Sequence, residues 1–146
     1  MISHQDIFRV LLIASCGYAL WRGRSDEQVV ALVCLGATVA TRIAISPVSV
    51  RYSRVEAGVL LIDLAVFASF LFVALRSPRF WPLWVAGLQL TSSMGHVIKA
   101  IDLQLLPRAY GAAIVLWSYP ILIILAIGTW RGWRRIRAEQ NQRSAA

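Results

Sequence analysis

Apolar residues along the chain fall into five long runs, which short polar or proline-containing connections separate. An α-helix needs about 20 predominantly apolar residues to cross a bilayer, and most of these runs approach that length. The pattern predicts an all-α integral membrane protein in which a bundle of five transmembrane helices forms a single domain over residues 1–130. The expected spans are about residues 6–21, 28–45, 56–75, 81–102 and 108–130, with a basic cytoplasmic tail over 131–146.

The first two runs differ in how clearly their helices begin. Arg9 interrupts the apolar residues of the first run, which spans the bilayer only if the lipid thins or the arginine reaches the headgroups. Otherwise this run lies along the surface, so four spans plus an N-terminal interfacial helix is the alternative architecture. In the second run, Ser25 is followed three residues later by Gln28, a spacing typical of a capping box at a helix start.

The run over residues 81–102 carries a polar stripe although it is long enough to cross a membrane. At 100° per residue its polar side chains recur on one face, opposite an apolar face. These polar residues are Gln89, Ser92, His96 and Lys99. Small residues predict close helix packing beside this stripe and in the second run, namely Gly87, Thr91, Gly95, Gly36 and Ala40. The helix over 81–102 is therefore expected at the centre of the bundle.

Composition and charge favour a membrane location. The chain has 146 residues, of which 58% are hydrophobic and 15% charged, and its net charge is +8. The arginines flank the apolar runs, so orientation in a membrane explains them and no nucleic-acid partner is expected. They concentrate in the first and third connections and in the tail, which positive-inside reasoning assigns to the cytoplasm. The expected location is a bacterial inner membrane, with the N-terminus outside and the C-terminus cytoplasmic.

The tail after residue 130 is expected to fray beyond its first turns, because it is basic and polar. Its first arginines serve as a topology anchor, and they suit binding to anionic lipid. These residues are Arg131, Arg134, Arg135 and Arg137.

The predicted orientation brings ionisable residues of different helices to similar depths in the outer half of the bilayer. Asp63 and His96 lie about 10 Å and about 8 Å below the outer ends of their helices, at about 1.5 Å per residue. An unpaired charge within a membrane is costly, so Asp63 is expected to pair with His96, Lys99 or Arg42. Asp102 lies at the rim of the same region. Such a group clasps two helices together, forms a proton or ion pathway, or binds a ligand.

No hydrolase, phosphate-binding or metal-binding motif occurs in the sequence, so no catalytic residue, metal or cofactor is expected. We therefore expect a non-enzymatic accessory, structural or interaction subunit, in which a polar clasp joins the third and fourth helices. Its expected partners are the lipid bilayer and other membrane-protein subunits or further copies of itself. The first alternative is a small transporter or a proton- or ion-conducting protein that uses Asp63, His96 and Lys99. The second is a membrane-embedded enzyme acting on a lipid or isoprenoid.

Overall fold

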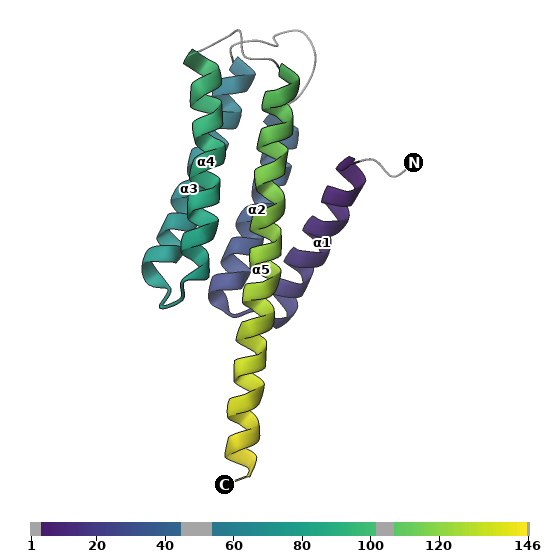
Figure 1. Ribbon diagram of the computed structural model, residues 1–146, viewed down its shortest axis with the longest axis vertical. Helices are drawn as coiled ribbons and strands as arrows, with labels where there is room; N and C mark the ends of the chain where they lie inside the picture. Colours follow the sequence, from purple (N-terminus) through teal and green to yellow (C-terminus); the bar gives the residue numbers. More distant parts are fainter. Residues whose placement is uncertain (1–3, 45–53, 102–106, 146) are drawn as a thin grey trace.

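The computed structural model describes residues 4–44, 54–101 and 107–145, with side chains over 6–44, 58–98 and 116–145. Over these ranges the chain forms five α-helices and no strand (Figure 1). The helices are α1 (His4–Arg22), α2 (Ser25–Ala44), α3 (Arg54–Arg76), α4 (Trp81–Ile101) and α5 (Pro107–Ser144). The first four agree with the predicted spans to within a few residues. The fifth does not end near residue 130, because α5 continues as one helix through the basic tail.

The helices are arranged as a closed ring. Each packs against its neighbours in the chain, α1 also packs against α5, and α2 reaches across to touch α5. Figure 1 shows the bundle with α5 extending beyond it at one end. We call this end the tight-turn end, because the short connections after α1 and after α3 lie there. The interior of the ring is therefore accessible to side chains from every helix.

The connection between α1 and α2 is a tight turn that requires glycine. The Gly23 amide donates to the Ala19 carbonyl oxygen at 2.8 Å, and a Cβ on Gly23 would lie 2.2 Å from that same oxygen. A capping box from Ser25 to Gln28 would make Ser25 the residue just before the helix. In the structure α2 already begins at Ser25, so Arg24 occupies the capping position. The Arg24 amide donates to Glu27 Oε2 at 2.9 Å, so Glu27 satisfies the free amide at the start of α2.

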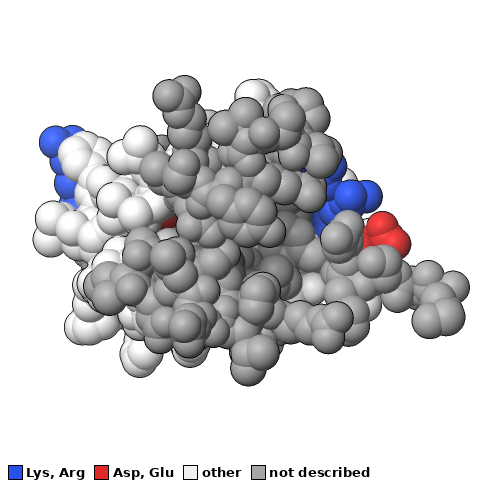
Figure 2. All heavy atoms as spheres, turned by 90° about the horizontal axis from the view of Figure 1, so that it is seen from above, with Lys and Arg blue, Asp and Glu red and all other residues white. Residues whose placement is uncertain are grey.

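The bundle has an apolar core that also contains several polar side chains, and it exposes many large apolar side chains on its surface. Large apolar side chains are exposed on every helix, for example Val10, Val39, Leu75, Met94 and Ile123. On the face seen in Figure 2, the described basic side chains lie at the margin and much of the other described surface is uncharged. Polar side chains are buried inside, namely Ser15, Glu27, Gln89, Ser92, Ser93 and Thr129. Extended apolar surface of this kind marks contact with lipid or with other protein.

Two of the described helical segments are long and apolar enough to cross a membrane, α2 and residues Gly58–Arg76 of α3. This is limited support for membrane association, and it does not confirm five spans. In α5 the described side chains begin only at Leu116, so part of its apolar half lies outside the described side chains.

The predicted packing stripe of small residues is wrong at three positions. Gly36, Gly87 and Thr91 are exposed, and no described atom lies within 4 Å of a Cβ built on either glycine. The reason is the rotation of α4, which turns its polar stripe inward and therefore carries Gly87 and Thr91 outward. The other two predicted packing residues, Gly95 and Ala40, are half-buried.

The glycines that do permit close approach lie on α5. A Cβ on Gly128 would lie 3.1 Å from the indole ring of Trp81, the first residue of α4. A Cβ on Gly132 would lie 3.3 Å from the Arg79 guanidinium group. The absence of side chains at these two positions lets α5 pack closely against the α3–α4 turn and the start of α4.

Candidate functional site

A cavity of about 350 Å³ lies inside the ring, and every helix contributes to its wall. Its residues are Phe8 and Leu12 of α1, Cys34, Ala37, Thr38, Thr41 and Arg42 of α2, Val59, Asp63, Val66 and Phe70 of α3, Gln89, Ser92 and His96 of α4, and Ser118, Ile121 and Leu122 of α5. Small-molecule sites in proteins begin at about 300 Å³, so this cavity has room for a small solute.

The chain direction of each helix gives the order of groups along the cavity. Arg42, in the last turn of α2, is exposed and lies toward the end opposite the tight turns. Phe70 comes seven residues after Asp63 in α3, which places it about 10 Å closer to the tight-turn end. Phe70 and Leu122 are buried, and buried apolar residues lie beyond them in the same direction, including Val85 and Leu125. The cavity therefore has an apolar floor on the tight-turn side.

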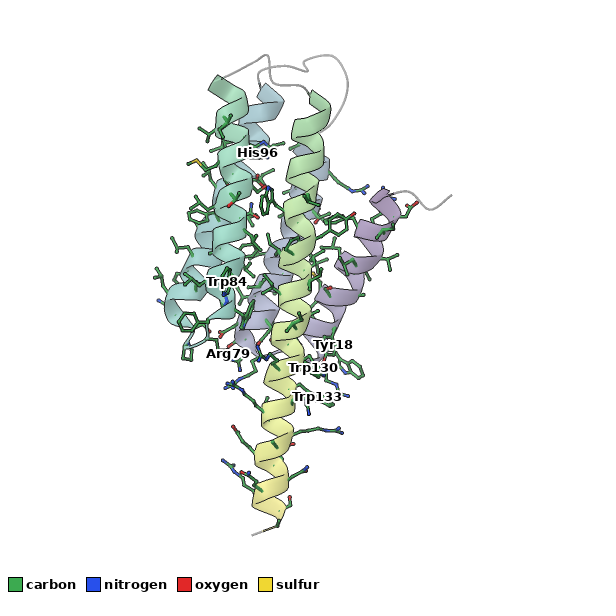
Figure 3. The ribbon with its side chains drawn as sticks, viewed as in Figure 1. Tyr18, Arg79, Trp84, His96, Trp130 and Trp133 are labelled. Atoms are coloured by element: carbon green, nitrogen blue, oxygen red, sulfur yellow. The ribbon has the colours of Figure 1, made fainter. Side chains whose placement is uncertain are left out.

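Asp63 and His96 meet inside this cavity and join α3 to α4. His96 Nε2 lies 2.9 Å from Asp63 Oδ2, and the two side chains are 14% and 20% exposed. The contact has the distance of an ion pair, which forms when the imidazole is protonated. The Asp63 Oδ2 atom receives no well-directed hydrogen bond from the described residues, so the contact with His96 is close in distance but lacks hydrogen-bond geometry. Figure 3 shows His96 in the half of the bundle away from the tight turns.

The structure brings most of the predicted site residues to one place. Asp63, His96, Arg42, Gln89 and Ser92 all line the cavity. Gln89 and Ser92 are buried, although they belong to the polar stripe of an otherwise apolar helix. The side chains of the other two predicted members, Lys99 and Asp102, lie outside the described residues.

A second ionic group, which the sequence reasoning missed, lies at the tight-turn end. The Glu27 carboxylate is 1% exposed and pairs with the Arg79 guanidinium group. A short hydrogen bond from Ser77 Oγ to Asp26 Oδ2, at 2.7 Å, ties the same two segments together. A Cβ on Gly132 would lie 3.4 Å from the Glu27 carboxylate, so α5 packs directly over the pair. Figure 3 shows Arg79 at this end of the bundle.

The spacing of Glu27 along α2 indicates that its side chain faces the interior of the bundle. Glu27 precedes Val30, Ala31 and Cys34 by three, four and seven residues, so it lies on the same face of α2 as the residues that pack inward. A negative charge is also favourable near a helix start, which by itself gives no reason for Glu27 to be buried.

The predicted lipid-binding arginines lie on the helical extension of α5. Two of them lie over tryptophan rings of the same helix, Arg134 at 5.0 Å from the Trp130 centroid and Arg137 at 4.5 Å from the Trp133 centroid. Arg22 of α1 also lies over Trp133, at 5.1 Å. Arg131 and Arg135 are exposed. The contact between Arg22 and Trp133 joins the start of the extension to α1.

Within the described residues, no three histidine, cysteine, aspartate or glutamate side chains are grouped in a way that could hold a metal ion. Comparison with protein-family models, with curated proteins and with solved structures finds no match for this chain.

Proposed function

We propose that all five helices span a bacterial inner membrane, with the N-terminus outside and the tight-turn end and C-terminus in the cytoplasm. The exposed apolar side chains on every helix support this placement. The charge asymmetry supports the orientation, because arginines gather at the tight-turn end and on the α5 extension. The arginines of this end are Arg22, Arg24, Arg76, Arg79, Arg131, Arg134, Arg135, Arg137 and Arg143. A C-terminal green fluorescent protein fusion should fluoresce, whereas a C-terminal alkaline phosphatase fusion should be inactive.

Within that membrane the protein functions, in this proposal, as a small proton-linked transporter. The observation that carries the proposal is the Asp63–His96 pair inside a cavity large enough for a solute. A carboxylate and an imidazole in contact within a membrane are groups that proton relays use, since both change protonation. A group that only joined two helices would not require a cavity beside it.

Coupling of solute to proton follows from the position of the pair. A solute that enters the cavity comes within reach of groups whose charge depends on one proton. Its binding therefore changes the proton affinity of the pair, and the proton changes the affinity for the solute by the same factor. The apolar floor around Phe70 and Leu122 closes the cavity toward the tight-turn end in this conformation. Transport then requires a second conformation in which that floor opens.

Proteoliposomes with a trapped pH dye test the transport function. The low-molecular-weight fraction of a cell extract is added outside, and lumenal pH is followed. Extract-dependent pH change is expected for the wild type and should be lost in Asp63→Asn. Ser69→Ala is the matched control on the same helix, because the Ser69 hydroxyl bonds only to the Ala65 carbonyl oxygen one turn earlier. Wild-type liposomes that respond no differently from empty liposomes would overturn the proposal.

The second candidate is the accessory or interaction subunit that the sequence favours first. The observation in its favour is that the Asp63–His96 contact joins two neighbouring helices, as a polar clasp would. If the protein has this function, Asp63→Asn should lower its stability, and adding the extract should cause no pH change inside the proteoliposomes. Mild-detergent pull-down would then recover a stoichiometric membrane partner.

A further inference from the structure

The net charge of the groups that line the cavity depends on whether the Asp63–His96 pair carries an extra proton. Among the described lining residues, the charged or titratable groups are Arg42 and the Cys34 thiol from α2, Asp63 from α3 and His96 from α4. The described lining residues of α1 and α5 contribute no ionisable group. With a neutral imidazole, the Arg42 cation and the Asp63 anion sum to zero. With a protonated imidazole, the sum is one positive charge.

Arg42 is the cation in this wall that has no carboxylate partner among the described residues, whereas Asp63 is already in contact with His96. Thr41, next to Arg42 in the chain, also lines the cavity, as does Thr38, whose hydroxyl already donates to the Cys34 carbonyl oxygen at 2.8 Å. Guanidinium and hydroxyl groups are donors that suit a carboxylate.

Apolar side chains make up much of the remaining wall, together with the polar Gln89, Ser92 and Ser118. Phe8 and Leu12 of α1, Phe70 of α3, and Ile121 and Leu122 of α5 line the cavity beside and below the polar groups. A ligand that fits this arrangement is small, carries one anionic head toward Arg42 and has a short apolar body toward the floor. A strongly hydrophilic ligand would leave its polar groups unpaired against Phe70 and Leu122.

We propose, resting on the transport function above, that the cavity binds a small organic anion with an apolar body, whose carboxylate pairs with Arg42, and that a proton on the Asp63–His96 pair accompanies it. The proton raises the summed charge of the described lining residues from zero to one positive charge, which favours the anion. The anion in turn favours the proton, because coupling between two binding events is reciprocal. The substrate class is thus a monocarboxylate that enters with a proton.

Three probes of matched size test this assignment on the purified full-length protein: benzoate, benzylamine and benzyl alcohol. Binding is measured by isothermal titration calorimetry in detergent, at about pH 6 and about pH 8, on either side of the range in which an imidazole ordinarily titrates. Benzoate is expected to bind more tightly than the other two, and more tightly at the lower pH. Arg42→Gln should weaken benzoate binding at least about tenfold, because a charge-assisted contact is lost.

Arg9→Gln is the matched control, because Arg9 is an exposed arginine that pairs with Asp6 outside the cavity wall. Arg42→Lys keeps the charge and should retain most of the affinity, which checks that loss in Arg42→Gln is not a folding defect. Benzylamine or benzyl alcohol binding as tightly as benzoate would overturn the anion assignment, as would no binding of any probe. Failure of the transport assay with intact benzoate binding would instead overturn the proposed function, since binding requires no transport.

Discussion

Glu27 of α2 and Arg79 of the α3–α4 turn form an ion pair whose carboxylate is 1% exposed and whose guanidinium side chain is 19% exposed. The pair joins two segments that are 52 residues apart in the chain. Gly132 of α5 covers it without a side chain. Three parts of the fold therefore meet at one buried charge pair at the tight-turn end.

Removing either partner of this pair should destabilise the protein, and by different amounts. Arg79→Gln leaves the more buried Glu27 anion without its partner and should cost about 3–5 kcal/mol. Glu27→Gln leaves a partly exposed guanidinium group and should cost less. The double variant should be more stable than Arg79→Gln alone. Unfolding by SDS titration in mixed micelles measures all three; strictly additive losses would contradict direct pairing.

Substitution by alanine should have different effects on stability at Gly128 and at Gly36. Gly128→Ala places a Cβ 3.1 Å from the Trp81 ring and should destabilise by about 1–3 kcal/mol, because an indole between two helices cannot move aside cheaply. Gly36→Ala is the control, since no described atom lies within 4 Å of its Cβ. It should be neutral or stabilise by up to about 1 kcal/mol through helix propensity. Equal effects on the thermal unfolding midpoint would argue against the close contact of α4 and α5.

Trp81→Phe should leave stability unchanged or raise it. The Trp81 Nε1 atom is buried and has no hydrogen-bond acceptor among the described residues. An unsatisfied buried donor costs about 1–3 kcal/mol, and phenylalanine removes it while keeping an aromatic ring beside Gly128. Trp81→Ala provides the contrast, because it also removes the packing. A large loss of stability in Trp81→Phe would mean that the indole nitrogen has an acceptor after all.

Asp63 and His96 should be energetically coupled, because His96 Nε2 lies 2.9 Å from Asp63 Oδ2. A double-mutant cycle with Asp63→Asn and His96→Gln measures the interaction energy, which for groups in contact is about 0.5–3 kcal/mol. Unfolding by SDS titration gives the stability of each variant. Losses that simply add would contradict a direct contact.

Much of the fold and the central pair could be predicted from the sequence. Hydrophobic runs and the connections between them gave helix limits close to those of the first four helices. The contact between Asp63 and His96 could be predicted for two reasons. Chain direction and rise per residue give the two residues similar positions along their helices, and a charge within a membrane needs a partner. The participation of Gln89 and Ser92 followed from the period of α4.

Other features depended on information that periodicity does not carry. Gly36 and Gly87 could be placed on a face but not on the correct side of the bundle, since rotation of a helix depends on all of its contacts. Glu27 and Arg79 are distant in the chain and each resembles an ordinary charge near a helix end. The tail was expected to fray because it is polar, yet arginine, glutamate and glutamine are good helix formers and continue α5.

The length of α5 has a mechanical consequence. The helix is 38 residues long, or about 57 Å, and Ser118, Ile121 and Leu122 in its described part form a wall of the cavity. The basic end of the same helix lies beyond the bundle, with Ser144 about 33 Å past Leu122. Between the cavity wall and the tip, α5 is held against Trp81, Arg79 and Arg22. Any tilt of the helix must break these contacts, so the fold fixes the position of the charged tip relative to the cavity.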